Sequence, residues 1–121
     1  MALKANKYKE KHMIFDLKNE APEVLPNFKG GEGEFFAKIH FDGLNKILHG
    51  TLPPHATIGL HTHESDSEII YILSGRGSVI DDGELFALEA GQCQYCPKGH
   101  SHSLINDSEE DLVFFAVVPV Q

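Results

Sequence analysis

Residues 68–88 have the sequence EIIYILSGRGSVIDDGELFAL, and this stretch decides the fold class. The segment 68–73 is rich in Ile, Tyr and Leu, and Gly75 and Gly77 then turn the chain. The next run, 78–80, ends at Asp82-Gly83, a pair typical of a two-residue β-hairpin, and 85–88 follows it. Apolar runs this short, separated by turn residues, predict consecutive β-strands.

The same spacing continues on both sides of this stretch. Towards the N-terminus, the runs 35–41 and 44–52 flank a second hairpin pair, Asp42-Gly43, and 58–63 leads into a polar loop at 64–67. Towards the C-terminus, three further runs cover 92–96, 100–105 and 112–118. No segment after residue 35 has the 3.6-residue period and the caps of a helix. The sequence therefore predicts an all-β sandwich or closed barrel.

The first 34 residues depart from this spacing. Residues 1–12 are polar and charged, and we expect a flexible arm there, followed by a single domain over 13–121. The short apolar segment 13–17 is predicted to add an edge strand. Residues 21–34 contain two prolines and three glycines, which predicts a loop.

Composition and charge exclude several classes of protein. Hydrophobic residues make up 41% of the chain, but no apolar run approaches the length of a membrane span. Residues 1–12 lack the apolar core of a secretory signal, so a cytoplasmic location is expected. The net charge of −8 repels phosphate backbones, which argues against nucleic acid as a partner.

The two cysteines form the run Cys93-Gln-Tyr-Cys96, which has the spacing of a redox or zinc motif. In a strand over 92–96, however, side chains three apart point to opposite faces, so the two sulfur atoms could not meet. We therefore interpret both as small apolar residues of a strand.

A first group of metal-ligand residue types lies at His61, His63 and Glu68. Residues i and i+2 of a strand point the same way, so both imidazoles face one side. Glu68 is five positions after His63, so in a continuous strand its side chain would point to the opposite face. The loop 64–67 interrupts the strand, so Glu68 can point to the same face as the two histidines. Imidazole suits Zn, Cu, Fe and Ni, and a carboxylate adds tolerance for Mn.

A second group follows the turn Pro97-Lys98-Gly99, which suits a type I turn with Pro at its second and Gly at its fourth position. This turn leads into a strand that carries His100 and His102. Periodicity alone allows either histidine to be a ligand.

Together these residues resemble the two sequence motifs of the cupin family. The pattern His61-x-His63-x₄-Glu68-x₆-Gly75 is similar to the ligand half of the first motif, and Gly91-x₅-Pro97-x-Gly99-x₂-His102-x₃-Asn106 is similar to the second. One position departs from the family, because His55 stands where the first motif usually opens with Gly.

The resemblance implies a double-stranded β-helix (jelly-roll) barrel that holds one divalent transition metal, among Fe, Mn, Zn, Ni and Cu. It implies His61, His63, Glu68 and His102 as the metal ligands, and thus His102 rather than His100. Cupins carry out many reactions, so three hypotheses follow. The protein is a small metalloenzyme (a dioxygenase, isomerase or lyase) acting on an organic acid or ring compound, a non-catalytic module that binds a small ligand in the barrel, or a barrel that only dimerises.

No proton-transfer residue stands out. His49 is a candidate on the strand 44–52, although an outer-face position is the simpler interpretation, and three other side chains are weaker candidates: His40, Tyr71 and Tyr95. His55 and His100 are expected in turns near the barrel mouth. Ile70, Ile72 and Leu104 share parity with the ligands and are expected to line the pocket, which favours a partly hydrophobic substrate.

An apolar outer wall predicts a homodimer. Ile69, Tyr71 and Leu73 lie on the strand face opposite the ligands, and 112–118 is apolar on both faces. The segment 13–17 is expected to pair across this dimer. Metal affinity should fall towards pH 5–6, because imidazoles bind metal only when neutral.

Overall fold

The computed structural model describes residues 14–121, which form ten strands and one short 3₁₀ turn. The elements are β1 (Glu23–Pro26), η1 (Phe28–Gly30), β2 (Glu34–Phe41), β3 (Asn45–Leu52), β4 (His61–Thr62), β5 (Glu68–Ser74), β6 (Arg76–Asp81), β7 (Glu84–Glu89), β8 (Cys93–Cys96), β9 (Ser101–Ile105) and β10 (Leu112–Pro119). The predicted arm at 1–12 lies outside the described residues. The all-β prediction is confirmed.

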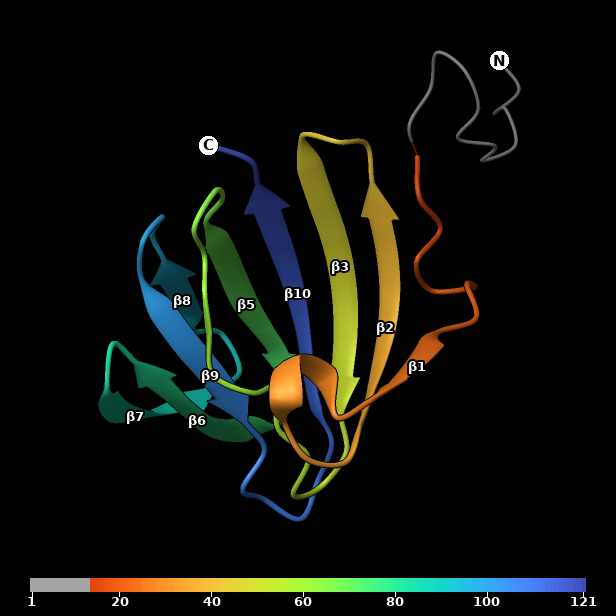
Figure 1. The fold of residues 1–121 in the computed structure, drawn as a ribbon. Coiled ribbons are helices and arrows are strands. Elements are labelled where there is room, and N and C mark those ends of the chain that lie inside the picture. The colour runs from red at the N-terminus through yellow and green to blue at the C-terminus, as the bar shows by residue number, and fades with distance from the viewer. Residues whose placement is uncertain (1–13) are drawn as a thin grey trace.

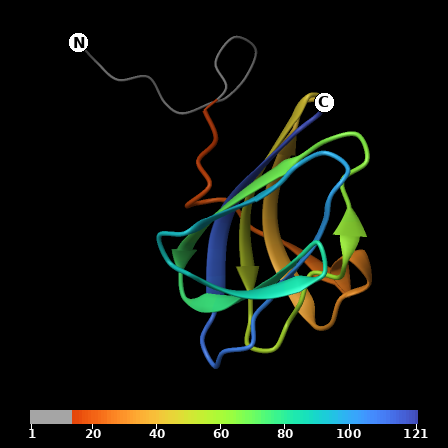
Figure 2. The ribbon, with the colours of Figure 1, turned by 90° about the vertical axis from the view of Figure 1, so that its left-hand side faces the viewer.

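The strands form two antiparallel sheets that face each other across the core (Figures 1 and 2). The larger sheet has the order β1-β2-β3-β10-β5-β8, and the smaller has the order β4-β9-β6-β7. Strands that are distant in the sequence pair side by side, because β10 lies between β3 and β5, and β9 lies between β4 and β6. This is the jelly-roll arrangement expected from the sequence.

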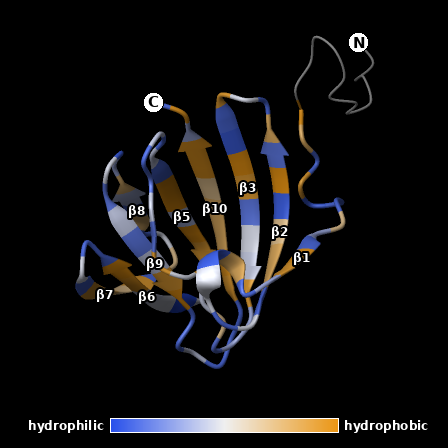
Figure 3. Ribbon diagram, viewed as in Figure 1, coloured by the Kyte–Doolittle hydropathy of each residue, from blue (hydrophilic) through white to orange (hydrophobic). Residues whose placement is uncertain are grey.

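Alternation of apolar and polar residues along the strands builds the core. In β10 every second residue is buried, from Leu112 to Val118, and in β3 the buried positions are Leu48, Gly50 and Leu52. Figure 3 shows the apolar residues of β5 and β10 side by side in the larger sheet. At the centre, the rings of Phe35 and Phe114 stack with their centroids 5.7 Å apart.

The hairpin at Asp82-Gly83 is confirmed, whereas the turn before β9 differs from its prediction. Asp81 pairs with Glu84, which leaves Asp82 and Gly83 as a two-residue loop with φ of 46° and 87°. Before β9, the amide of His100 donates to the carbonyl of Pro97, so Gly99 occupies the third turn position rather than the fourth. Its φ of 88° explains the glycine, because that conformation is strained for other residues.

Two predictions for the N-terminal region are wrong. Residues 14–17 form no strand, and residue 13 lies outside the described part of the chain. Residues 21–34 are not all loop, because β1 within them pairs with β2 from Glu23↔Ala37 to Pro26↔Glu34. The free edge of β2 provides this partner, which the local Pro- and Gly-rich composition does not reveal.

His55, which stands where the cupin motif usually has Gly, adopts a backbone conformation that suits glycine. His55 has a φ of 67°, the left-handed conformation that glycine adopts readily. The amide of His55 donates to the carbonyl of Asn106 at 2.8 Å, which ties this turn to the end of β9. The histidine therefore occupies a glycine-like conformation in this turn.

The η1 turn packs directly on the segment that precedes β4. Figure 1 shows η1 in front of the larger sheet, and the amide of Gly59 donates to the carbonyl of Phe28 at 3.0 Å. A Cβ on Gly59 would lie 2.0 Å from the carbonyl oxygen of Lys29, and one on Gly31 would lie 2.1 Å from that of Thr57. Glycine at both positions thus allows two backbone segments to touch.

The described residues include no helix that is long and apolar enough to cross a membrane.

We predict that Gly59→Ala destabilises the fold by about 2–3 kcal/mol, because the new methyl group must push η1 away. Gly43→Ala is the matched control, since it has open space but a φ of 92°, and we expect a cost of about 1–2 kcal/mol from backbone strain alone. Thermal unfolding of both variants measures the difference. A Gly59→Ala protein as stable as the wild type would contradict the close contact.

Candidate functional site

Four side chains from separate elements converge inside the barrel. His61 lies on β4, His63 directly follows it, Glu68 begins β5, and His102 lies on β9. One nitrogen or oxygen atom from each of them lies within 4.8 Å of every other. The convergence predicted from the two sequence motifs is therefore confirmed, and His100 is not part of the cluster.

The backbone explains why these positions meet. His61 pairs with His102 in the β4–β9 register, which places both imidazoles on the same inward face. Beyond β4, the amide of His63 donates to the carbonyl of His100, and the amide of Gly99 donates to the carbonyl of His63. The chain then turns through 64–67, so Glu68 starts β5 with its side chain inward, as the parity argument predicted.

The spacing of the four atoms fits a transition-metal site. The Nε2 atoms of His63 and His102 lie 3.0 Å apart, and those of His102 and His61 lie 3.2 Å apart. Glu68 Oε1 lies 2.9, 3.2 and 3.9 Å from the Nε2 atoms of His102, His63 and His61. Ligands at about 2.1 Å from one ion are separated by about 3 Å when adjacent in an octahedron and by about 4.2 Å when opposite.

Each imidazole is oriented by a hydrogen bond at its other nitrogen. His61 Nδ1 donates to the carbonyl oxygen of Gly59 at 2.7 Å, His63 Nδ1 to the Asp66 carboxylate at 2.6 Å, and His102 Nδ1 to the Gln94 side-chain oxygen at 2.9 Å. These partners hold the proton on Nδ1 and leave the Nε2 lone pair directed into the cluster.

The charge state of the cluster follows from the same contacts. Burial alone would raise the pKa of the Glu68 carboxyl, but His102, His61 and His63, which can donate to it through Nε2 once protonated, outweigh burial and hold that pKa well below its usual value. The hydrogen bond to Glu68 raises the pKa of His63 against the opposing effect of burial, and Asp66 contributes in the same direction. Glu68 is therefore an anion at neutral pH.

A small cavity of about 240 Å³ opens beside the cluster. Its lining includes three of the four side chains, together with residues of η1, β3, β4, β10 and the loop 64–67: Phe28, Lys29, Lys46, Leu48, His61, Thr62, His63, Glu64, Ser65, Asp66, Glu68 and Val118. Ile70, Ile72 and Leu104 are instead 1%, 0% and 2% exposed in the core. The expected apolar lining by these three residues is wrong, and the cavity wall is largely polar.

The candidate proton-transfer residues lie elsewhere. His49 and His40 sit at outward positions of β3 and β2, where His49 pairs with Lys38 and Phe115. Tyr71 and Tyr95 are exposed on the outer face of the larger sheet. None of these side chains lines the cavity beside the cluster.

Two supporting residues, Asp66 and Gln94, escaped the sequence analysis. Gln94 is 6% exposed, and its side-chain nitrogen donates to Asp81 at 3.4 Å and to the carbonyl of Tyr95 at 3.3 Å, which orients its oxygen towards His102. An isolated buried polar residue in an otherwise apolar strand is the signal that marks Gln94. The three-residue spacing from His63 is the signal that marks Asp66.

The two cysteines do not form a site. Cys93 is exposed and Cys96 is buried, as opposite faces of β8 require, and both are free. Burial, with a smaller effect from the negative charge of Glu68, raises the pKa of the Cys96 thiol to about 11. A thiol that stays protonated is a poor metal ligand.

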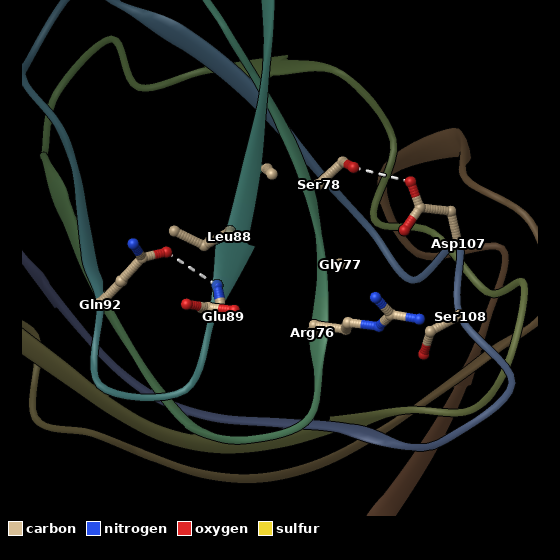
Figure 4. A pocket seen from close by; sticks show the side chains of 9 residues that line it. Arg76, Gly77, Ser78, Leu88, Glu89, Gln92, Asp107 and Ser108 are labelled. Atoms are coloured by element: carbon tan, nitrogen blue, oxygen red, sulfur yellow. Dashed lines mark hydrogen bonds between the residues drawn. The ribbon is translucent and has the colours of Figure 1, made fainter.

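A second cavity, of about 530 Å³, lies against β6 and β7 (Figure 4). Arg76, Ser78, Glu89, Gln92 and Asp107 line it, and none of the four converging side chains does. Figure 4 shows that its polar groups bond to one another, since Ser78 donates to Asp107 at 2.6 Å and Gln92 accepts from the amide of Glu89 at 2.9 Å. The smaller cavity, beside the four converging side chains, is therefore the candidate functional site.

Comparison with known proteins agrees with this fold. Residues 48–118 match the family model of the cupin domain. The oxalate-binding protein of Thermotoga maritima is 36% identical over 103 residues, which cover 80% of this chain and 85% of that protein.

Two solved structures show the same architecture. A Thermotoga maritima protein described as a predicted oxalate decarboxylase superposes with a TM-score of 0.85 and 32% identity, over 90% of this chain and all of that one. The cupin domain of Schizosaccharomyces pombe Cnp3 superposes with a TM-score of 0.73 at 13% identity, over 88% of this chain and 73% of that one, and supports the fold alone. The chain belongs to the cupin family.

Proposed function

We propose that His61, His63, Glu68 and His102 hold one divalent transition metal, and that this centre binds a small organic acid in the cavity beside it. The observation that carries the metal is the set of inward lone pairs. Three Nε2 atoms and one carboxylate oxygen face each other at separations of 2.9 to 3.9 Å, while each Nδ1 already donates elsewhere. Such an arrangement of acceptors repels itself unless a cation lies at its centre.

The organic acid is supported by the site and by its relatives. Four protein ligands leave two positions on a six-coordinate ion, which suits chelation by a carboxylate. The cavity of about 240 Å³ admits only a small ligand. One relative at 36% identity is described as oxalate-binding, and we take oxalate as the representative ligand.

Catalysis on the bound acid is the second candidate function. A divalent ion polarises a bound carboxylate, which assists lyase, isomerase or oxygen-dependent chemistry. Glu64 lines the cavity and is exposed, with no hydrogen bond or ion pair to another residue within 14–121, so it is the carboxylate that is free to move a proton. Non-catalytic binding needs no such group.

Isothermal titration with oxalate tests the proposal. Protein loaded with Mn²⁺ should bind one oxalate per chain, and protein stripped by a chelator should bind none. His61→Ala should abolish both metal and oxalate binding, whereas His49→Ala, on the outer sheet face, should abolish neither. Equal oxalate binding with and without metal would refute the proposal, and oxygen uptake or product formation would identify the catalytic alternative.

Asp66 should tune the centre through His63. Asp66→Asn keeps the shape but removes the charge that accepts the Nδ1 proton, so we expect metal affinity to fall about 10-fold to 100-fold. Chelator competition measures this loss. Glu64→Gln in the same loop removes an equal charge without touching an imidazole, and it should change the affinity far less; equal losses in the two variants would contradict the role of Asp66.

Metal affinity should fall as the pH decreases from 8 to 5. A protonated imidazole cannot bind the ion. In the folded protein the pKa of His63 is raised above the usual value for histidine, so His63 takes up its proton closer to neutral pH. Protons thus compete at a higher pH than at an ordinary histidine. Metal content after dialysis across this range measures the effect, and a constant content down to pH 5 would contradict three histidine ligands.

A homodimer through the outer face of the larger sheet forms part of the proposal. Ile69, Tyr71, Leu73 and Tyr95 are 41–54% exposed there. The register places Tyr71 beside Phe115 and Ile69 beside Val117, so the apolar surface continues across β5 and β10. An exposed apolar patch shared by several strands is typical of a two-fold interface.

Tyr71→Glu should shift the protein towards a monomer, because it places a charge in the middle of this face. Phe86→Glu is the control, since Phe86 is similarly exposed, at 49%, but lies on β7 of the other sheet. Light scattering at micromolar concentration distinguishes the two. A wild-type monomer, or a dimer unaffected by Tyr71→Glu, would contradict this interface.

A further inference from the structure

Two lysines line the cavity beside the four converging side chains, in a chain that is acidic as a whole. The protein has 18 Asp and Glu residues against 10 Lys and Arg, yet both Lys29 and Lys46 line this cavity. Three carboxylates also line it: Glu68 is one of the four converging side chains, Asp66 accepts a hydrogen bond from His63, and Glu64 is exposed. The two ammonium groups are therefore the groups of this wall that suit an anionic ligand.

Lys46 occupies an inward position in the barrel wall. It precedes the buried positions Leu48 and Gly50 at the same parity of β3. It pairs with Val118 of β10, which is 7% exposed. On the other side of β10, Val117 pairs with Ile69 of β5. The next residues along the two strands, Val118 and Glu68, are therefore also opposite each other. Lys46 and Glu68 thus face the interior from two strands on either side of β10, in one row across the sheet.

Neither lysine has a carboxylate partner among the described residues. The ammonium of Lys46 lies 5.7 Å from the centroid of the Phe41 ring, and that of Lys29 lies 5.6 Å from that of Phe28. A ring face stabilises a cation but leaves its N–H groups free to donate to an oxygen anion. Both lysines can therefore bind a carboxylate without breaking an existing ion pair.

The backbone of Lys29 is held in an unfavourable conformation at the cavity. Its φ is 56°, a left-handed value that is strained for a long side chain. Close contact of its carbonyl with Gly59 keeps η1 in place, and the carbonyl of Gly59 in turn accepts a hydrogen bond from His61 Nδ1. Strain of this kind persists where the position of a side chain matters for function.

We propose that Lys46 and Lys29 bind the second carboxylate of a dicarboxylate ligand, and so make the site select small dianions over monoanions. This inference rests on the proposed function. One carboxylate would bind the ion, and the second would accept hydrogen bonds from the two ammonium groups. A monocarboxylate would leave these donors unused.

Titration of the Mn²⁺-loaded protein with oxalate and with acetate tests this selectivity. Lys46→Met removes the charge at nearly constant length, and Lys29→Asn does so with a residue that tolerates a left-handed backbone. Each should weaken oxalate binding about tenfold or more, because a charge-assisted hydrogen bond is lost. Acetate affinity should change less than twofold, and Lys18→Met, an exposed lysine outside the cavity, should change neither.

The outcomes separate this inference from the proposed function. If the metal-loaded wild type binds no oxalate, the proposed function fails and the inference fails with it. If the wild type binds oxalate and both variants bind it equally well, or if oxalate and acetate affinity fall together, the inference alone is overturned. Metal content and thermal unfolding are measured on each variant, and if Lys46→Met does not fold, Lys29→Asn decides.

Discussion

The mutual repulsion of four converging acceptors is the constraint on which the site depends. Three imidazole nitrogens and one carboxylate oxygen are buried together inside the barrel, and their lone pairs point at one another. A cation resolves this repulsion in full, whereas protons resolve it only in part. The raised pKa of His63 and the lowered pKa of Glu68 are signs of that partial compensation, because each shift favours a proton shared between a base and an anion.

The two sheets provide the rigidity that this convergence needs. His61 and His102 are directly paired across β4 and β9, and Glu68 approaches from the other sheet. The barrel therefore fixes the ligand positions through its backbone pairing, and the hydrogen bonds at Nδ1 fix only the rotation of each ring. Gly59 contributes both to the ring orientation and to the backbone packing. Its carbonyl orients His61, and because it has no Cβ, η1 can lie against it in the wall of the cavity. In this way the N-terminal region contributes to the shape of the site.

The sequence predicts the strands and the four converging residues well, because both depend on local spacing. Alternation along β3, β5 and β10 and the hairpin pair Asp82-Gly83 are local signals, and the i, i+2 relation of His61 and His63 follows from strand geometry. The choice of His102 over His100 needed the family resemblance, since periodicity allows both. Strand β1 was missed because its stability comes from pairing with β2, which lies in no local window of sequence. The cavity lining was missed for the same reason, because Lys29 and Lys46 come from elements brought together only by the fold.

X-ray absorption at the metal edge of protein purified without a nickel column tests the central claim most directly. The account predicts a single first-row ion per chain, surrounded by three imidazole nitrogens and one carboxylate oxygen at about 2.0–2.2 Å, with the remaining positions filled by light atoms. A spectrum with sulfur in the first shell, or with fewer than three imidazoles, would contradict the claim that His61, His63, Glu68 and His102 form a metal centre.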